Sequence, residues 1–265
     1  MQSTKIFNAK KFIDGNASMV HDALTVEEIL NISINGEAYT MTMRTPGDEE
    51  ALVRGILLSE NVYNHKEINP IFFITEKNEQ DFITKVNIII PKENIKKGID
   101  TKRNLVSVSS CGMCGKSEMD LTLDGEKIIP KQKLNILNIK KMFAKMSEHQ
   151  NTFKHSGGSH ASAAFTIDGK LLAIKEDIGR HNAVDKVIGS LLLEKKLEQA
   201  QCILVSGRLS YEIVSKCFNA KIPFLAAVSA PSSMSIEYCE KTGITLLAFC
   251  RENKCTVYTH EENIA

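Results

Sequence analysis

Apolar and polar residues alternate along residues 27–50, near the start of the chain. One alternating run carries Leu30, Ile32 and Ile34, and a second run carries three apolar side chains at Tyr39, Met41 and Met43. Asn35-Gly36 stands between the two runs. That dipeptide between alternating runs is typical of a two-residue turn. The pattern predicts a β-hairpin, and we expect the ordered part of the chain to begin here.

The hydrophobic period changes after this hairpin. Leu52, Ile56 and Leu57 recur at helical spacing, and acidic residues precede them. Acidic side chains favour the positive N-terminal end of a helix, and Thr45 or Asp48 is a suitable capping residue. Short apolar runs at residues 71–75 and 85–91 then predict two further strands. This half of the chain therefore reads as a small α+β unit.

From residue 134 onward, short apolar runs alternate with segments of helical period. Gly, Pro and Ser stand where one pattern gives way to the next. This alternation is typical of an α/β domain with three layers and a mostly parallel sheet. We therefore expect an α/β protein with two domains, a smaller α+β domain over residues 1–130 and a three-layer domain over residues 131–265.

Charge and composition exclude several classes of protein. The formal net charge of +1 gives no overall attraction to nucleic acid or to an anionic membrane. The N-terminal residues lack the apolar core of a secretory signal, and the apolar runs are too short to span a bilayer. An odd count of seven cysteines argues against a disulfide framework and favours the cytoplasm. Four of the cysteines fall in predicted elements and are expected in the core: Cys202, Cys217, Cys239 and Cys250.

Cys111 and Cys114 form the one Cys-x-x-Cys motif, and they follow a basic polar run at residues 92–105. That context predicts a loop that is mobile and accessible. Lys116 lies close by, and a cation lowers the pKa of a neighbouring thiol. An accessible thiolate can accept sulfur from a persulfide or take part in disulfide exchange. These residues alone do not rank a sulfur carrier above a redox dithiol.

The rest of the chain lacks the residues that the common zinc sites need. A structural zinc site needs four ligands, and no second Cys-x-x-Cys pair is present. A zinc deaminase needs His-x-Glu followed by Pro-Cys-x-x-Cys, with the Glu moving the proton. The nearest analogue here is His160-Ala161-Ser162, which has no Glu. We therefore predict no metal ligands.

Basic side chains follow several predicted strands where the chain turns into a helix. Arg180 and His181 open one predicted helix, and Arg208 precedes another, which Ser210 is expected to cap. Residues 227–235 and 249–254 supply two more strand ends. In α/β sheets, ligands bind at the carboxyl ends of strands, and helix N-termini attract anions. We expect these loops to line one rim that holds a phosphate-bearing ligand.

Five stretches of the chain resemble the FdhD family of formate dehydrogenase accessory sulfurtransferases. They read RTPGDEEALVRGILLSE, SSCGMCGKSE, EDIGRHNAVDKVIG, SGRLSYEIVSK and IPFLAAVSAPSSMSIEYCEKTGITLLAFCRENKCTVYTH. The resemblance implies a sulfurtransferase that accepts sulfur as a persulfide from a cysteine desulfurase. It passes the sulfur to Mo-bis(molybdopterin guanine dinucleotide), the cofactor of formate dehydrogenase. Cys111 would carry the persulfide, with Cys114 as its partner.

The same resemblance implies further structural features. The three-layer domain would resemble cytidine deaminase without its zinc site, and the protein would form a homodimer. The cofactor-binding segment would comprise Phe249, Cys250, Arg251, Glu252, Asn253 and Lys254. One departure from the family pattern is His155-Ser156-Gly157-Gly158, where family members usually carry Thr-Gly-Gly. Two alternatives stay open, a non-covalent chaperone of the molybdenum cofactor and a zinc-binding or thiol-redox protein.

Overall fold

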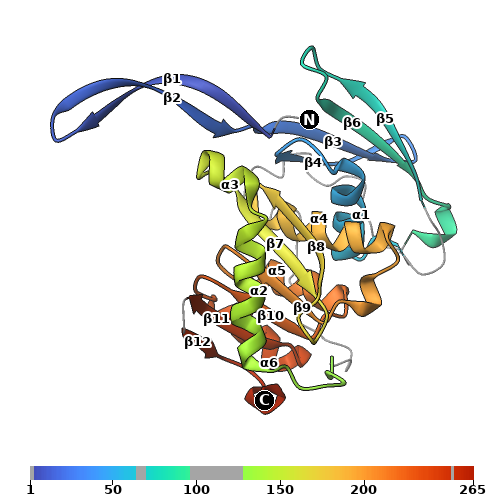
Figure 1. The fold of residues 1–265 in the computed structure, drawn as a ribbon. Coiled ribbons are helices and arrows are strands. Elements are labelled where there is room, and N and C mark those ends of the chain that lie inside the picture. Colours follow the sequence, from blue (N-terminus) through green and yellow to red (C-terminus); the bar gives the residue numbers. More distant parts are fainter. Residues whose placement is uncertain (1–2, 64–69, 96–127, 252–253) are drawn as a thin grey trace.

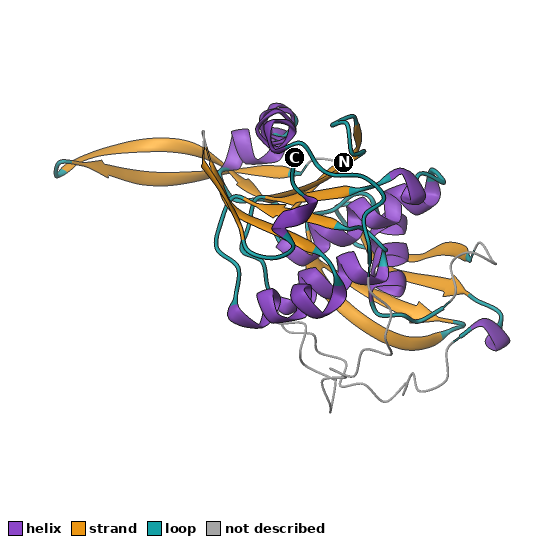
Figure 2. Cartoon of the chain, turned by 90° about the horizontal axis from the view of Figure 1, so that it is seen from below, coloured by secondary structure: helices purple, strands orange, loops and turns teal. Residues whose placement is uncertain are grey.

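A computed structural model describes residues 3–63, 70–95, 128–251 and 254–265 (Figure 1). Its strands form a two-stranded, a four-stranded and a six-stranded sheet. The helices lie mainly against the six-stranded sheet, as the view from below shows (Figure 2). The elements used below are given with their bounds where they first appear.

The chain opens with a long antiparallel hairpin that the sequence pattern did not predict. Strands β1 (Thr4–Ile13) and β2 (Asn16–Thr25) pair along their whole length and project from the body (Figure 1). Asp14 and Gly15 at its turn both have positive φ, as a two-residue hairpin turn requires. The expectation that order begins near residue 27 is therefore wrong. The apolar side chains of this hairpin are exposed. Neither face packs on a core, so its sequence lacks the alternation of apolar and polar residues that predicts a strand.

The predicted hairpin at residues 27–50 is confirmed. Strands β3 (Glu28–Ile34) and β4 (Glu37–Arg44) join β5 (Ile71–Lys77) and β6 (Ile83–Ile89) in the order β4-β3-β6-β5. Asn35 and Gly36 have φ of 53° and 84°. Positive φ at both positions identifies a type I′ turn, which explains why Asn-Gly is found there.

Helix α1 (Glu49–Ser59) confirms the predicted helix but not its predicted cap. Asp48 stands at the N-cap with a left-handed φ of 58°, and its side chain makes no cap hydrogen bond. That carboxylate instead pairs with Lys175, with Nζ and Oδ1 2.6 Å apart. Thr45 faces another segment, because its hydroxyl accepts a hydrogen bond from the backbone N–H of Ile178. Tertiary partners thus replace the local caps.

The second half contains a six-stranded sheet in the order β12-β11-β10-β9-β7-β8. Strands β9 (Cys202–Val205), β10 (Phe224–Ala227) and β11 (Thr245–Arg251) are parallel to each other. Strand β7 (His160–Phe165) runs antiparallel to β9 and to β8 (Leu171–Asp177), and β12 (Lys254–Val257) runs antiparallel to β11. The expectation of a mostly parallel sheet is wrong, because three of its five strand pairs are antiparallel: β7 with β8, β7 with β9 and β11 with β12.

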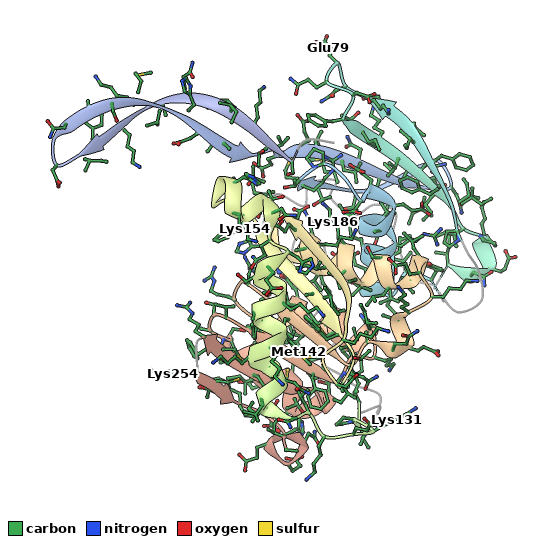
Figure 3. The ribbon with its side chains drawn as sticks, viewed as in Figure 1. Glu79, Lys131, Met142, Lys154, Lys186 and Lys254 are labelled. Carbon is green, nitrogen blue, oxygen red and sulfur yellow. The ribbon has the colours of Figure 1, made fainter. Side chains whose placement is uncertain are left out.

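Helices cover both faces of this sheet. Helix α2 (Ile136–Glu148) packs on one face through Met142 and Met146, and Figure 3 labels Met142 at this helix. The other face carries α4 (Arg180–Leu193), α5 (Tyr211–Asn219) and α6 (Ser233–Thr242). The three-layer α/β arrangement is therefore present. Its specific likeness to cytidine deaminase stays a prediction.

Two glycines let α1 pack directly on α4. A Cβ added at Gly55 would lie 1.9 Å from the carbonyl oxygen of Asp185, and one at Gly189 would lie 1.7 Å from that of Ala51. Any larger residue would force the helix backbones apart. The four-stranded sheet and α1 share a separate apolar core, which includes Leu30, Leu52 and Ile88. The predicted domain boundary at residue 130 adjoins residues outside the described part and stays a prediction.

Candidate functional site

Four strands of the six-stranded sheet end at the same edge. Strands β9, β10 and β11 are parallel, and β8 points the same way because both β8 and β9 are antiparallel to β7. Three loops and the end of β11 therefore meet at this edge: residues 178–179, residues 206–210, residues 228–232 and residues 249–251. The predicted rim of strand ends is present in the structure, and we call it the C-terminal edge.

A buried ion pair fixes the start of α4 at this edge. The carboxylate of Asp177 lies 2.7 Å from Lys186 Nζ and accepts hydrogen bonds from the backbone N–H groups of Thr45 and Gly179. Both charged side chains are almost fully buried, and Figure 3 labels Lys186 in the interior. Asp177 and Lys186, two of the charged residues in segment 176–186, therefore stabilise the fold. Arg180 and His181 are the charged residues of this segment that begin α4.

His181 pairs with a residue that the sequence reading did not select. Its Nε2 lies 2.9 Å from the carboxylate of Glu212 in α5 and 3.2 Å from the hydroxyl of Ser210. Ser210 does occupy the N-cap of α5, but its side chain makes no cap hydrogen bond. Glu is common in the first turn of a helix, so only the contact with His181 identifies Glu212 as a candidate site residue.

His160 lies beside Arg180 across the loop that follows β9. The nearest atoms to a Cβ built on Gly207 are Arg180 Cδ at 3.3 Å and His160 Nδ1 at 3.4 Å. Burial lowers the pKa of His160, and the positive charges of Arg180 and His181 lower it further. Both effects disfavour the charged imidazole, and the positive charges of Arg180 and His181 each account for a smaller part than burial does.

Neighbouring strand ends are tied together by backbone contacts. Arg251 Nε donates to the carbonyl of Val228 at 3.0 Å, and the N–H of Phe249 donates to the carbonyl of Ser229. The N–H of Leu209 donates to the carbonyl of Ala230 in the same way. The loops after β9 and β10 and the end of β11 therefore form one continuous surface.

Three further cations are exposed along this surface. Arg208, Arg251 and Lys254 all have exposed side chains, and Figure 3 labels Lys254 at the start of β12. The N-cap residues of α4 and α5, Gly179 and Ser210, make no side-chain cap hydrogen bond, and both helices begin at this edge. Exposed cations and helix N-termini together make an edge suited to phosphate groups. Glu252 and Asn253 lie outside the described residues.

The predicted sulfur-carrying pair, Cys111 and Cys114, also lies outside the described residues. Three described cysteines are buried as expected, and burial raises the pKa of the Cys202, Cys217 and Cys239 thiols, for Cys217 to about 12. Cys250 is buried too, but its sulfur contacts that of Cys255, a residue the sequence reading passed over. No group of three or more His, Cys, Asp or Glu side chains suited to a metal ion occurs within the described ranges.

His155 lies apart from these residues. It is exposed on α3 (Asn151–Ser156), and its Nδ1 donates to the carbonyl of Asn151 one turn earlier. Gly157 ends that helix in the left-handed conformation, with φ of 65°. The glycine turn that departs from the family pattern thus serves as a helix C-cap, and only His160 beyond it reaches the C-terminal edge.

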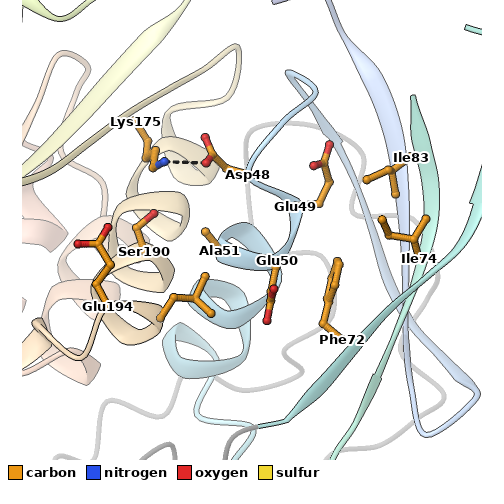
Figure 4. A pocket seen from close by; sticks show the side chains of 11 residues that line it. Asp48, Glu49, Glu50, Ala51, Phe72, Ile74, Ile83, Lys175, Ser190 and Glu194 are labelled. Atoms are coloured by element: carbon orange, nitrogen blue, oxygen red, sulfur yellow. Dashed lines mark hydrogen bonds and ion pairs between the residues drawn. The ribbon is translucent and has the colours of Figure 1, made fainter. Parts of the chain in front are cut away.

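An open hollow of about 410 Å³ lies elsewhere, between α1, α4 and the four-stranded sheet (Figure 4). Its charged lining is mainly acidic, and its four acids already have partners: Asp48 with Lys175, Glu49 with Arg44, Glu50 with Arg54 and Glu194 with Lys196. None of the predicted site residues lines it. Its charge does not suit an anionic ligand, so the C-terminal edge is the better candidate site.

The fold and this edge define an α/β protein whose sheet presents basic groups at its strand ends. A model of the FdhD/NarQ family matches residues 25–265, and the chain belongs to that family. The sulfur carrier protein FdhD of Saccharolobus solfataricus is 42% identical over 98% of both chains. That of Mycolicibacterium paratuberculosis is 36% identical over the full length of both.

Solved structures support the fold. A formate dehydrogenase accessory protein of Desulfotalea psychrophila, described as putative, superposes over the whole of both chains with a TM-score of 0.77 at 20% identity. Within the part of the chain that the structure describes, no helix is long and apolar enough to cross a membrane. The family membership expected from the five sequence stretches is confirmed.

Proposed function

We propose that this protein is a sulfur carrier that takes persulfide sulfur from a cysteine desulfurase onto Cys111. It then passes the sulfur to the molybdenum cofactor of formate dehydrogenase. Relatives at 36–42% identity over nearly the whole chain carry the name sulfur carrier protein, and this observation carries the proposal. The accessory protein with the same fold supports formate dehydrogenase as the client enzyme.

The loading step is a thiol exchange. The Cys111 thiolate attacks the outer sulfur of the desulfurase persulfide, a new S–S bond forms at Cys111, and the desulfurase thiolate leaves. The step involves no net oxidation, so no further reactant is needed. Cys114, three residues away, is the partner thiol.

The substrate that receives the sulfur is Mo-bis(molybdopterin guanine dinucleotide), which carries several phosphate groups. The C-terminal edge supports its binding, because Arg208, Arg251 and Lys254 are exposed there beside Arg180 and His181. Helices α4 and α5 both begin at the same edge, where the positive ends of their dipoles favour phosphate groups. Phe249 adds an exposed aromatic ring, which suits contact with a flat guanine or pterin ring.

Mass spectrometry tests the loading step. Protein incubated with a cysteine desulfurase and cysteine should gain one sulfur atom on the peptide that contains Cys111. The Cys111→Ala variant should not gain it and should fail to activate formate dehydrogenase. Activation by Cys111→Ala at the wild-type level would instead favour a non-covalent cofactor chaperone. Bound zinc at one ion per chain, held by the thiols, would favour the metal-binding alternative.

Guanosine diphosphate tests the binding edge separately. Calorimetric titration should detect binding to the wild-type protein, and Arg208→Gln should weaken it about fivefold, equivalent to about 1 kcal/mol. Lys241→Gln is the matched control, since this lysine is exposed at the opposite end of α6. Equal affinity in all three proteins would place the nucleotide somewhere else.

A further inference from the structure

Cys250 and Cys255 bring their sulfur atoms within 2.8 Å of each other across the β11–β12 hairpin. That separation is well inside ordinary contact between two thiols, and a disulfide at about 2.05 Å needs only a small further movement. The two residues are five positions apart in one hairpin, and both pack against the apolar cluster beneath α2. They form a second thiol pair, distinct from the Cys-x-x-Cys motif.

A β-bulge places these sulfurs opposite each other. Ala248 pairs with Thr256 and Arg251 with Lys254, which leaves two residues of β11 facing one residue of β12. Phe249, the extra residue, has φ of 52°, a conformation that is costly for a bulky side chain. Bulges of this kind redirect side chains and are frequent beside functional sites.

The two thiols have different environments. Cys250 is 5% exposed and packs in the apolar core beneath α2, whereas Cys255 is partly exposed. The hydrogen bond between them raises the pKa of Cys250 and lowers that of Cys255. Cys255 is thus the more nucleophilic of the two, and Cys250 is the buried partner, the usual division in a reactive dithiol.

The pair lies at the edge where we place the cofactor substrate. Its neighbours on β11, Phe249 and Arg251, contact the loop after β10. Cys255 directly follows Lys254, one of the exposed cations of this edge. A metal centre takes sulfur as sulfide, whereas a persulfide carries it two electrons more oxidised, and a nearby dithiol can supply those electrons.

We propose that Cys255 and Cys250 take sulfur from a persulfide and release it as sulfide, an inference that rests on the proposed sulfur-carrier function. The Cys255 thiolate attacks the outer sulfur of the donor, the donor thiolate leaves, and Cys255 becomes a persulfide. The Cys250 thiol then attacks the Cys255 sulfur. An S–S bond forms between the two cysteines, and the outer sulfur departs with the protons as hydrogen sulfide. The two thiols are oxidised, the transferred sulfur is reduced, and a thiol reductant restores the pair.

The pair is tested in a Cys111→Ala, Cys114→Ala protein, reduced and treated with glutathione persulfide without oxygen. We expect a cross-linked peptide that has lost two hydrogen atoms, joining Cys250 to Cys255, and one equivalent of sulfide. The Cys250→Ser variant should instead retain one added sulfur on Cys255. Cys255→Ser should show neither product, and Cys217→Ala, a core cysteine, serves as the matched control.

Absence of the cross-link, or sulfide release at the same rate in Cys255→Ser, would overturn the proposal. A cross-link formed without sulfide would do so too, because it would show ordinary oxidation. If the serine variants fail to fold, the rates at which Cys255 and Cys250 are alkylated in the wild-type protein test the proposal. Cys255 must react well before Cys250 at pH 7, and equal or reversed rates would contradict the assigned roles.

The donor is identified by loading with a cysteine desulfurase and cysteine. A cross-link that requires Cys111 identifies the persulfide of the protein itself as the source, and one that forms equally in Cys111→Ala identifies a persulfide in solution. Failure of Cys111 to gain sulfur would refute the proposed carrier function but not the proposal for Cys250 and Cys255. The glutathione persulfide experiment reports on the second pair whatever happens at Cys111.

Discussion

His181 at the start of α4 and Glu212 in the first turn of α5 form an ion pair, with Nε2 and Oε2 2.9 Å apart. Both side chains are largely buried. Burial alone favours the neutral carboxyl, but the hydrogen bond and charge of His181 outweigh it, with help from Lys216 and Arg180. The pKa of Glu212 is therefore lowered. The pair joins the two helices whose N-termini open at the C-terminal edge.

Replacing His181 with Ala should destabilise the fold in a pH-dependent way. Because the pKa of Glu212 is lower in the folded protein than in the unfolded chain, its ionised form stabilises the fold above the unfolded value. That stability is lost as the pH falls through the lowered pKa. We expect the free energy of unfolding to drop by roughly 1–2 kcal/mol near pH 6. The difference should shrink toward pH 3, as urea unfolding at each pH will measure.

Glu212→Gln provides the control for that experiment. It should give a similar loss near pH 6, and the double variant should lose less than the sum of the two single variants. Additive losses, or a loss that does not depend on pH, would show that the ion pair has no share in stability.

The lowered pKa of His160 responds in part to the positive charge at the C-terminal edge. Burial is its main cause, and Arg180 is the strongest of the positive neighbours. Arg180→Gln should therefore raise the pKa of His160 while leaving it below its usual range. Imidazole signals followed by NMR during a pH titration will measure this shift. Arg208→Gln, which is exposed and not among the causes, should leave it unchanged.

A bound anion should shift the same group. Guanosine diphosphate at this edge would favour the charged imidazole, so the pKa of His160 should rise on binding. By linkage, the nucleotide should bind more tightly as the pH falls through that pKa. If saturating nucleotide leaves the titration curve of His160 unchanged, the nucleotide does not bind close to His160.

Elements whose apolar face meets a core were predictable from the sequence. The β3–β4 hairpin, α1 and the helices after residue 134 all carry that signal, and all are present. The β1–β2 hairpin carries no such signal, because its apolar side chains are exposed along both strands. The antiparallel pairing of β7 with β9 was not predictable, since a short buried run looks the same in a parallel and an antiparallel pair.

The position of Arg180, His181 and Arg208 at strand ends was predictable from the sequence, and their role in binding stays a prediction. Glu212 and Cys255 were not, because their importance comes from a partner that only the fold brings close. A Glu in a first helical turn and a Cys in a terminal strand are ordinary in a single sequence. Contacts across elements leave no local pattern to recognise.

The contact between α1 and α4 depends on Gly189. Alanine normally favours a helix over glycine by about 1 kcal/mol, so propensity alone predicts that Gly189→Ala stabilises. The added Cβ would overlap the carbonyl oxygen of Ala51 at 1.7 Å, and the helices would have to separate. We expect a net loss of at least about 2 kcal/mol in the free energy of unfolding. Ala144→Gly, on the exposed face of α2, is the control and should lose only about 1 kcal/mol.

Lys216 in α5 neutralises a buried carboxylate that would otherwise be isolated. Its Nζ lies 2.7 Å from Asp185 Oδ2, and Ser59 donates a hydrogen bond to the same carboxylate. Lys216→Met should therefore cost roughly 3–5 kcal/mol, and a second change, Asp185→Asn, should recover much of that loss.

The loss in Lys216→Met should also depend on pH. Burial raises the pKa of Asp185 even with Lys216 present, and removing the lysine should raise it further. A group with a raised pKa in the fold stabilises it at low pH, and that stability is lost as the pH rises through the folded value. Urea unfolding should therefore show a smaller loss for Lys216→Met at pH 5 than at pH 8. The same loss at both pH values would mean that the lysine stabilises α5 through packing of its carbon chain and not through its charge.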